Sequence, residues 1–398
     1  MEVDFNSAEF ARDYKQVYME LHTGGCPFAH SSAGDFYAVA AHKDIVEACV
    51  QSGQWSSKYG PGLGYQPLDT PGVLVSVDPP EHTFEARLVG KAFSKTYFES
   101  FVPGIQDFVN RRIDAVIAKG RCDIHEEISE PLPLWVIFEM FGRSIDAEGM
   151  KAFREGLLYG VGQMLRPADA GTPQNPATHF LADHLAETKR RLAAGEADPD
   201  DNLLTRFIAT EIGGRRLTDE KILGFCSFLL TAGSATTTIL LSNLIHRLLT
   251  TPDQFAKLQG NRDLIPLAIE ECLRVDAPVH GLFRTNNQPT ELGPLKMAAD
   301  TKVMMLWAAG SLDPTVFPDP TKFDLDRDIN EVRKHLAFGY GIHICRGAPL
   351  SRIEAQIFLE TILDRLPNLR LDGEVVAETR APVLQGIRSL PIAWDVPR

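Results

Sequence analysis

The stretch of sequence that decides the fold is FGYGIHICRG, which runs from Phe338 to Gly347. Gly339 and Gly341 allow backbone conformations that side chains forbid, so the chain can turn tightly and direct amide N–H groups at Cys345. A helix is predicted directly after the loop, and the partial positive charge at its start favours a thiolate over a thiol. The pattern predicts one thiolate shielded by Phe338, with a small buried cysteine beside a turn as the simpler alternative.

Such a lone thiolate suits a metal that has one protein ligand and a ring of its own. The chain has six cysteines, which stand singly, and no Cys or His lies at zinc-ligand spacing from Cys345. The decapeptide matches Phe-Gly-x-Gly-x-His-x-Cys-x-Gly at every fixed position. It thereby resembles the cysteine loop of the cytochrome P450 (haem-thiolate monooxygenase) superfamily, of the soluble bacterial type.

The resemblance implies a mainly α fold with a minor β part, with the haem between the long central helix and the helix after the cysteine loop. It implies haem b (iron protoporphyrin IX) as the cofactor, with Cys345 as the axial thiolate ligand and Phe338 and Gly339 beside it. Three further markers appear in the family's order, and the second of them is Phe317-Pro318-Asp319-Pro320 with Arg327 behind it. Glu271 and Arg274 lie three residues apart, on one helix face. The resemblance implies that they form a buried brace with Arg327, whereas a surface ion pair is the alternative.

The third marker is Ala232-Gly233-Ser234-Ala235-Thr236-Thr237 in a long apolar helix. Small residues at Ala232 and Gly233 would let the haem plane lie against the helix and leave room for dioxygen. The Thr236 hydroxyl can bond the carbonyl group of Ala232, four residues back, and loosen the helix locally. A threonine that only satisfies its own hydrogen bond in a core helix is the alternative. With the cysteine loop present, Thr236 is the candidate catalytic hydroxyl at the oxygen site.

Two departures from the family pattern stand out. Ala235 occupies the position where the family usually carries Asp or Glu, so protons would have to pass through Thr236 and ordered water, or through the substrate. The family's His-x-x-x-Arg pair for a haem propionate is also incomplete. His82 is present, but Ala86 stands at the arginine position, and Arg87 lies about 100° further around the helix.

Other donors fit the propionates better. Arg284 and His335 match family positions for these groups, and their N–H donors would neutralise two carboxylates that are costly to bury. For each of these residues taken alone, a solvated surface position is the alternative.

The substrate pocket is expected between the loop 53–77, the helix at residues 232–236, the segment after Pro278 and a strand near the end of the chain. His280 would either hydrogen-bond a polar group of the substrate or play a structural part. The candidate substrate-binding residues are Leu229, Ala235, His280, Val383 and Leu384.

The predicted function is insertion of one atom of dioxygen into a small, mainly apolar organic substrate, by hydroxylation or oxidative demethylation. No Gly-x-Gly-x-x-Gly phosphate loop occurs, so electrons are expected from a separate ferredoxin and ferredoxin reductase, docked at a face that includes Arg346. Two alternatives remain open. One is a peroxide-driven haem enzyme, and the other is a non-catalytic haem-binding recruitment or sensor module.

Composition and the hydrophobic pattern limit the possible partners, location and domain organisation of the protein. The 398 residues carry a net charge of −13, which opposes a nucleic-acid or anionic-membrane partner. Unpaired cysteines and the absence of a signal-peptide pattern predict a cytoplasmic protein. The uncharged stretch 222–245 is long enough to span a membrane, but its polar residues favour a buried helix.

We expect a single domain over residues 1–398, without a fused reductase or ferredoxin domain. Helices are expected at residues 80–118 and 264–275, among others.

Overall fold

The computed structural model describes the chain except for residues 33, 64–71, 143–176, 381–382 and 397–398. Two compact units are present, and each is built from separated stretches of sequence. The first comprises Met1–Trp55, Val102–Leu132 and Thr236–Arg398, and the second comprises Ser56–Phe101 and Pro133–Ala235. Part of the loop 53–77 expected to wall the substrate pocket lies outside the described residues.

The first unit contains the cysteine loop and the helices that support it. The helix α15 (Ala348–Arg365) follows the loop directly and packs against α5 (Val102–Asp114) and α12 (Ile265–Val275). Every residue of α12 except Pro266 is buried, so the charged side chains of this helix need buried partners. The other helices of this unit are α1 (Ala8–Thr23), α2 (His42–Val50), α11 (Pro252–Gly260), α13 (Trp307–Gly310) and α14 (Ile329–Val332).

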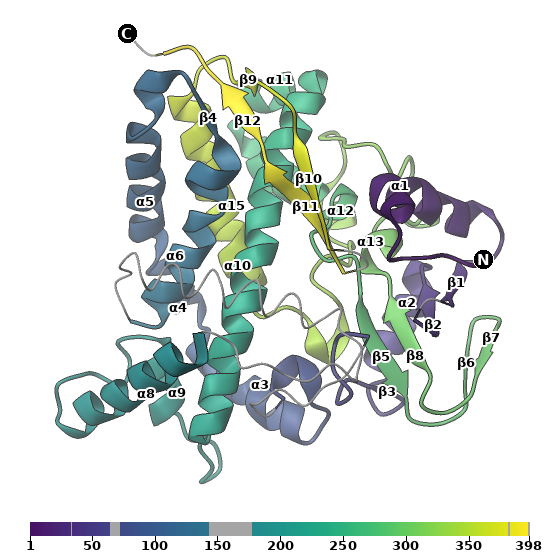
Figure 1. Cartoon of the computed structure of the whole chain (residues 1–398), viewed down its shortest axis with the longest axis horizontal. Helices are drawn as coiled ribbons and strands as arrows, with labels where there is room; N and C mark the ends of the chain where they lie inside the picture. Colours follow the sequence, from purple (N-terminus) through teal and green to yellow (C-terminus); the bar gives the residue numbers. More distant parts are fainter. Residues whose placement is uncertain (33, 64–71, 143–176, 381–382, 397–398) are drawn as a thin grey trace. The chain divides into compact units, whose positions relative to one another are not determined.

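Small sheets complete this unit (Figure 1). The largest has the strand order β1 (Phe28–Ser31), β2 (Phe36–Val39), β8 (Lys302–Met305), β5 (Leu282–Asn286) and β3 (Trp55–Ser56). Strands β2 and β8 are parallel, whereas β1–β2 and β5–β8 are antiparallel. The remaining strands are β4 (Arg121–Asp123), β12 (Pro391–Ala393) and β9 (Arg370–Leu371) in one sheet, the hairpin β10 (Val376–Arg380) and β11 (Leu384–Ser389), and the hairpin β6 (Thr290–Leu292) and β7 (Leu295–Met297).

The second unit is helical in the part that the structure describes. Its helices include α3 (Glu81–Ala92), α4 (Lys95–Glu99), α8 (Ala177–Ala193) and α9 (Leu203–Ala209), and α6 (Pro131–Met140) falls largely within it. The region 80–118, expected as helical throughout, is divided into α3, α4 and α5. The division follows from Ser94, whose side chain accepts a hydrogen bond from the Tyr97 N–H and starts α4 afresh.

The long helix α10 (Asp219–Thr250) has 32 residues. It is the one helix among the described residues that is long and apolar enough to cross a membrane, with a mean hydropathy of 1.5 over its best window. Half of that window is buried inside the protein, which agrees with the buried core helix expected from the sequence. In the first unit, Gly386 of β11 lies against Ile239 of α10, and the hairpin runs beside this part of the helix (Figure 1). The mainly α architecture with a minor β part is thus confirmed.

Candidate active site

Two glycines shape the loop around Cys345. Gly339 and Gly341 have φ values of +69° and +73°, in the left-handed region that favours glycine. A Cβ atom at Gly341 would lie 2.3 Å from the carbonyl oxygen of Cys49. The loop is closed by a hydrogen bond of 2.9 Å from the Cys345 N–H to the Phe338 carbonyl oxygen. The sequence pattern therefore reflects both backbone conformation and a close approach to α2.

The sulfur of Cys345 faces donors from the first turn of α15. Desolvation by the surrounding protein raises the pKa of the Cys345 thiol, while the N–H groups of Gly347 and Ala348 and the charge of Arg352 act to lower it. The residue nevertheless keeps an exposed surface. The described part of the chain holds no group of three His, Cys, Asp or Glu residues that could bind a metal ion. The exposed surface of Cys345 and the N–H groups that favour its thiolate fit an iron that has one protein thiolate ligand and takes its other ligands from a ring.

The predicted Glu271–Arg274 brace is present and buried. Arg274 donates to both carboxylate oxygens of Glu271 at 2.7 and 2.8 Å, and both side chains are fully buried. Arg274 also donates to the carbonyl oxygens of Pro320 and Lys322, and Arg327 donates to Glu271 at 3.0 Å. The surface-pair alternative is therefore wrong, and the brace ties α12 to the segment before the cysteine loop.

The structure places His335 differently from the sequence expectation. Its Nε2 atom lies 3.0 Å from the carboxylate of Glu270, and its Nδ1 atom accepts a hydrogen bond from the Ala337 N–H at 3.2 Å. Both ring nitrogens thus have partners within the protein. The expected propionate contact would require one of these bonds to break. The structure also joins Arg352 to Glu270, and the sequence interpretation had included neither of these two residues.

The predicted propionate donor Arg284 lies in β5 and is buried, with 4% of its surface exposed. It donates to the Phe283 carbonyl oxygen at 2.9 Å. Lys302 lies on the neighbouring strand β8. Burial, and in smaller part the charge of Arg284, lowers the pKa of Lys302 to about 8. This corner of the sheet therefore concentrates positive charge in a partly desolvated setting, which suits an anionic group.

On α3, His82 is buried and Arg87 is exposed. This agrees with the expectation that the one-residue shift turns Arg87 away from the direction of His82. The sequence interpretation missed Glu85, which is fully buried on the same helix. Glu85 accepts a hydrogen bond from Lys221 at 2.6 Å and another from the Leu74 N–H at 2.6 Å.

The central part of α10 carries a partly accessible stripe. Leu229, Ala232, Gly233 and Thr236 recur at helical spacing and are only partly buried, as is Ala235. At Gly233, however, an added Cβ would lie 2.6 Å from the Ile137 side chain of α6. The missing side chain there serves helix packing, so any haem contact of Gly233 would involve its backbone.

Near the carboxy terminus, the predicted pocket residues meet the segment around His280. Val383 accepts a hydrogen bond from the His280 N–H, Leu384 pairs with Val279, and both apolar side chains are buried. The His280 ring itself packs against Tyr14 and bonds the Tyr18 hydroxyl at 2.7 Å through Nδ1. These contacts to α1 support the structural part for His280 over a substrate contact.

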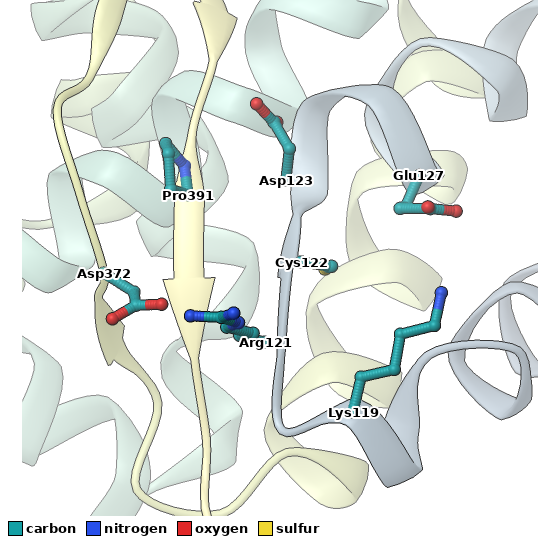
Figure 2. Close-up of a pocket in the computed structure, with 7 residues that line it drawn as sticks. All are labelled: Lys119, Arg121, Cys122, Asp123, Glu127, Asp372 and Pro391. Carbon is teal, nitrogen blue, oxygen red and sulfur yellow. The ribbon is translucent and has the colours of Figure 1, made fainter.

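A surface pocket of about 420 Å³ lies among β4, β9 and β12 (Figure 2). Its lining is mostly charged, and burial raises the pKa of its one thiol, Cys122, to about 12. None of the predicted site residues lines it. This pocket is therefore separate from the chemistry assigned to the cysteine loop.

Comparison with known proteins decides the family. The family model described as Cytochrome P450 matches residues 174–373. The chain is 34% identical over 364 residues to cyclomarin C epoxidase CymV from Salinispora arenicola, covering 89% of each protein. This chain is a cytochrome P450. It is also 35% identical to the cytochrome P450 monooxygenase PikC of Streptomyces venezuelae, covering 81% of this chain and 76% of PikC.

Solved cytochromes P450 share the fold over nearly the whole length. CYP109Q5 from Chondromyces apiculatus superimposes with a TM-score of 0.88 at 28% identity, covering 100% of this chain and 99% of that one. CYP109E1 from Bacillus megaterium, solved in complex with testosterone, gives a TM-score of 0.81 at 29% identity, covering 96% and 97%. This P450 is therefore a monooxygenase by family, and the family implies haem ligated by a cysteine thiolate.

Proposed function

We propose that this P450 hydroxylates or oxidatively demethylates a small, mainly apolar organic molecule, with haem b bound through Cys345. The observation that carries the proposal is the cysteine loop, with its two left-handed glycines and its sulfur held at the start of α15. The bound haem would supply reductive activation of dioxygen, because thiolate ligation favours O–O cleavage. The protein supplies orientation and exclusion of water.

Several residues are proposed to hold the haem. Arg284 is the best placed propionate donor of the first unit, because it is buried beside Lys302 in a positively charged corner. His82, Phe338, Gly339 and Ala232 are retained as haem contacts from the family pattern. Gly233 is retained for its backbone only.

The proposed substrate contacts are apolar. Leu229 and Ala235 lie on the partly accessible stripe of α10, and Val383 and Leu384 present buried aliphatic side chains. Named relatives include a cyclomarin C epoxidase and a steroid C26-monooxygenase of Mycobacterium tuberculosis, the latter 32% identical to this chain. Steroids and other mainly apolar small molecules are therefore the first compounds to screen.

Thr236 is proposed to hold and pass the two protons that dioxygen activation consumes. Its neighbour Ala235 offers no carboxylate, so the hydroxyl would work with ordered water or with a polar group of the substrate. The peroxide-driven alternative rests on the absence of a carboxylate at position 235.

Electrons are proposed to come from a ferredoxin and its reductase at the face that carries Arg346. This residue is exposed, as are Ile344 and Tyr340 in the same loop. An exposed cation beside apolar side chains suits a small acidic electron carrier, and its association should weaken with salt. We propose that residues 1–398 act as one P450 domain in the cytoplasm, and the six free cysteines are consistent with a reducing compartment.

The test combines binding and turnover. Steroids, macrocycles and terpenoids are titrated into the ferric protein, and displacement of water from the iron is followed through the Soret band. A compound that binds is then incubated with NAD(P)H, a ferredoxin, a reductase and isotopically labelled dioxygen. One labelled oxygen atom in a hydroxylated product, or formaldehyde released together with a demethylated product, supports the proposal. Turnover with hydrogen peroxide alone supports the alternative, and dioxygen consumption with no oxidised product from any binding compound contradicts the proposal.

A further inference from the structure

We propose that Glu270, Arg352 and His335 form a clamp that positions Phe338 and, through it, the Cys345 sulfur. The inference rests on the proposed function of Cys345 as the haem ligand and deepens it by assigning positioning residues to that bond. The clamp is separate from the Glu271 brace, although the two glutamates are neighbours on α12. Consecutive helical residues point about 100° apart, so Glu270 and Glu271 serve different partners.

Glu270 is the centre of the clamp. Its side chain is 2% exposed. Its Oε1 atom accepts from Arg352 Nε at 2.6 Å, and its Oε2 atom accepts from another Arg352 nitrogen at 3.0 Å. The same Oε2 atom lies 3.0 Å from His335 Nε2. This paired geometry with Arg352 is the strong, directional form of a charge-assisted hydrogen bond.

The charge on Glu270 is fixed at neutral pH. Burial alone would raise the pKa of its carboxyl group, but the hydrogen bonds and charges of His335 and Arg352 outweigh burial and bring the pKa to about 2. A buried carboxylate is costly unless it is paired. Loss of either partner would therefore disturb the whole cluster instead of removing one contact.

Two routes lead from Glu270 to Phe338. On the first, the Arg352 guanidinium group lies 4.5 Å from the centre of the Phe338 ring, within cation–π range. On the second, His335 accepts a hydrogen bond from the Ala337 N–H, directly before Phe338. The Phe338 carbonyl group in turn accepts the Cys345 N–H at 2.9 Å. One carboxylate on α12 thus fixes both the ring and the backbone that set the position of the sulfur.

Arg333 provides a matched control. It approaches the same Oε1 atom of Glu270, at 3.6 Å, but it is half exposed. The ring contacts of Phe338 involve Arg352 and His335. Of the two arginines, Arg352 is the one that contacts the Phe338 ring, so a positioning role predicts an effect for the Arg352 change and none for the Arg333 change.

The experiment follows the stability of the iron–sulfur bond in holoprotein. The reduced, carbon-monoxide-treated wild type and the variants Glu270→Gln, Arg352→Gln and Arg333→Gln are held at one elevated temperature and one pH. The red-shifted Soret band of the thiolate complex is monitored as it converts to the unshifted band. We expect Glu270→Gln and Arg352→Gln to convert about tenfold faster or more, since each removes charged hydrogen bonds at a buried site. Arg333→Gln should convert at the wild-type rate.

A double variant tests the coupling. Glu270→Gln combined with Arg352→Gln should convert no faster than the faster single variant, because both changes break the same clamp. Circular dichroism confirms that each variant is folded before the comparison. Wild-type rates in both single variants, equal effects of the Arg333 and Arg352 changes, or additive effects in the double variant would each overturn the inference. A wild type that never shows the red-shifted band would instead refute the proposed function.

Discussion

Replacing Gly341 with alanine is the perturbation whose cost can be worked out most directly from the structure. The residue has a φ of +73°, and a Cβ there would lie 2.3 Å from the Cys49 carbonyl oxygen and 3.0 Å from its carbon. Left-handed backbone costs a non-glycine residue about 1–2 kcal/mol. Forcing an atom into backbone that cannot swing aside costs about 1–3 kcal/mol more. We therefore expect Gly341→Ala to lower the free energy of unfolding by about 2–5 kcal/mol.

Two other glycines separate the contributions. Gly213 has a φ of +59° with nothing within 4 Å of the added atom, so Gly213→Ala should cost only the backbone part, about 1–2 kcal/mol. Gly339 has a φ of +69°, and its added atom would lie 3.3 Å from the Trp307 ring, which is close but not prohibitive. The expected order of destabilisation is therefore Gly213→Ala, then Gly339→Ala, then Gly341→Ala.

The assay is chemical denaturation of holoprotein, followed by circular dichroism and by the Soret band of the reduced carbon-monoxide complex. Gly341→Ala should also weaken the thiolate band at denaturant concentrations where the bulk fold is intact, because the strain is local to the cysteine loop. A Gly341→Ala variant as stable as Gly213→Ala would refute the reasoning, since the close approach to Cys49 would then carry no cost.

Three further predictions concern buried charges and the oxygen site. Asp276→Asn should destabilise the fold by about 3–5 kcal/mol near neutral pH, because Lys15 and Arg247 lose their shared carboxylate. Burial alone would raise the pKa of Asp276, but the charges and hydrogen bonds of Lys15 and Arg247 outweigh burial and hold that pKa below its ordinary value. Its contribution is thus present above the unfolded pKa of about 4 and is lost as pH falls further, so pH-dependent unfolding should show the gap from wild type closing in acid. Lys221→Met should cost a similar amount by leaving the buried Glu85 without its cation, and combining it with Glu85→Leu should recover most of the loss in thermal unfolding. Thr236→Ala should lower the fraction of electrons recovered in product roughly tenfold or more, measured against hydrogen peroxide release, whereas a Thr237→Ala control should keep wild-type coupling because that side chain is buried.

The part of the site that could be predicted from sequence is the part with local rules. The cysteine loop could be predicted because positive φ values require glycine at fixed positions before the cysteine. The Glu271–Arg274 pair could be predicted because residues three apart lie on the same face of a helix. The exposure of Arg87 also follows from helix periodicity alone. Each of these interpretations depends on neighbours within a few residues.

Contacts between distant segments could not be predicted in the same way. The His280 ring meets Tyr18 across 262 positions of sequence, and Arg352 meets Glu270 across 82. A signal for the second contact was present, because two consecutive glutamates in an apolar helix demand two sets of buried partners. Its identity was hidden, since any of the 40 lysines and arginines could have filled that place.

The boundaries of helices likewise depend on tertiary contacts that the sequence pattern does not reveal. The region 80–118 is helical in pattern, yet it forms three helices because Ser94 caps a new start and Pro103 stands in the first turn of α5. Both signals are visible in the sequence. Their outcome depends on how Tyr97 and Phe98 are buried, which is a tertiary property.

The measurement that bears most directly on the account is the absorption spectrum of the reduced protein under carbon monoxide. We predict a strongly red-shifted Soret band for the wild type and its complete loss in Cys345→Ala. An unshifted band in the folded, haem-loaded wild type, or a red-shifted band that survives the Cys345→Ala substitution, would contradict the assignment of this sulfur as the iron ligand.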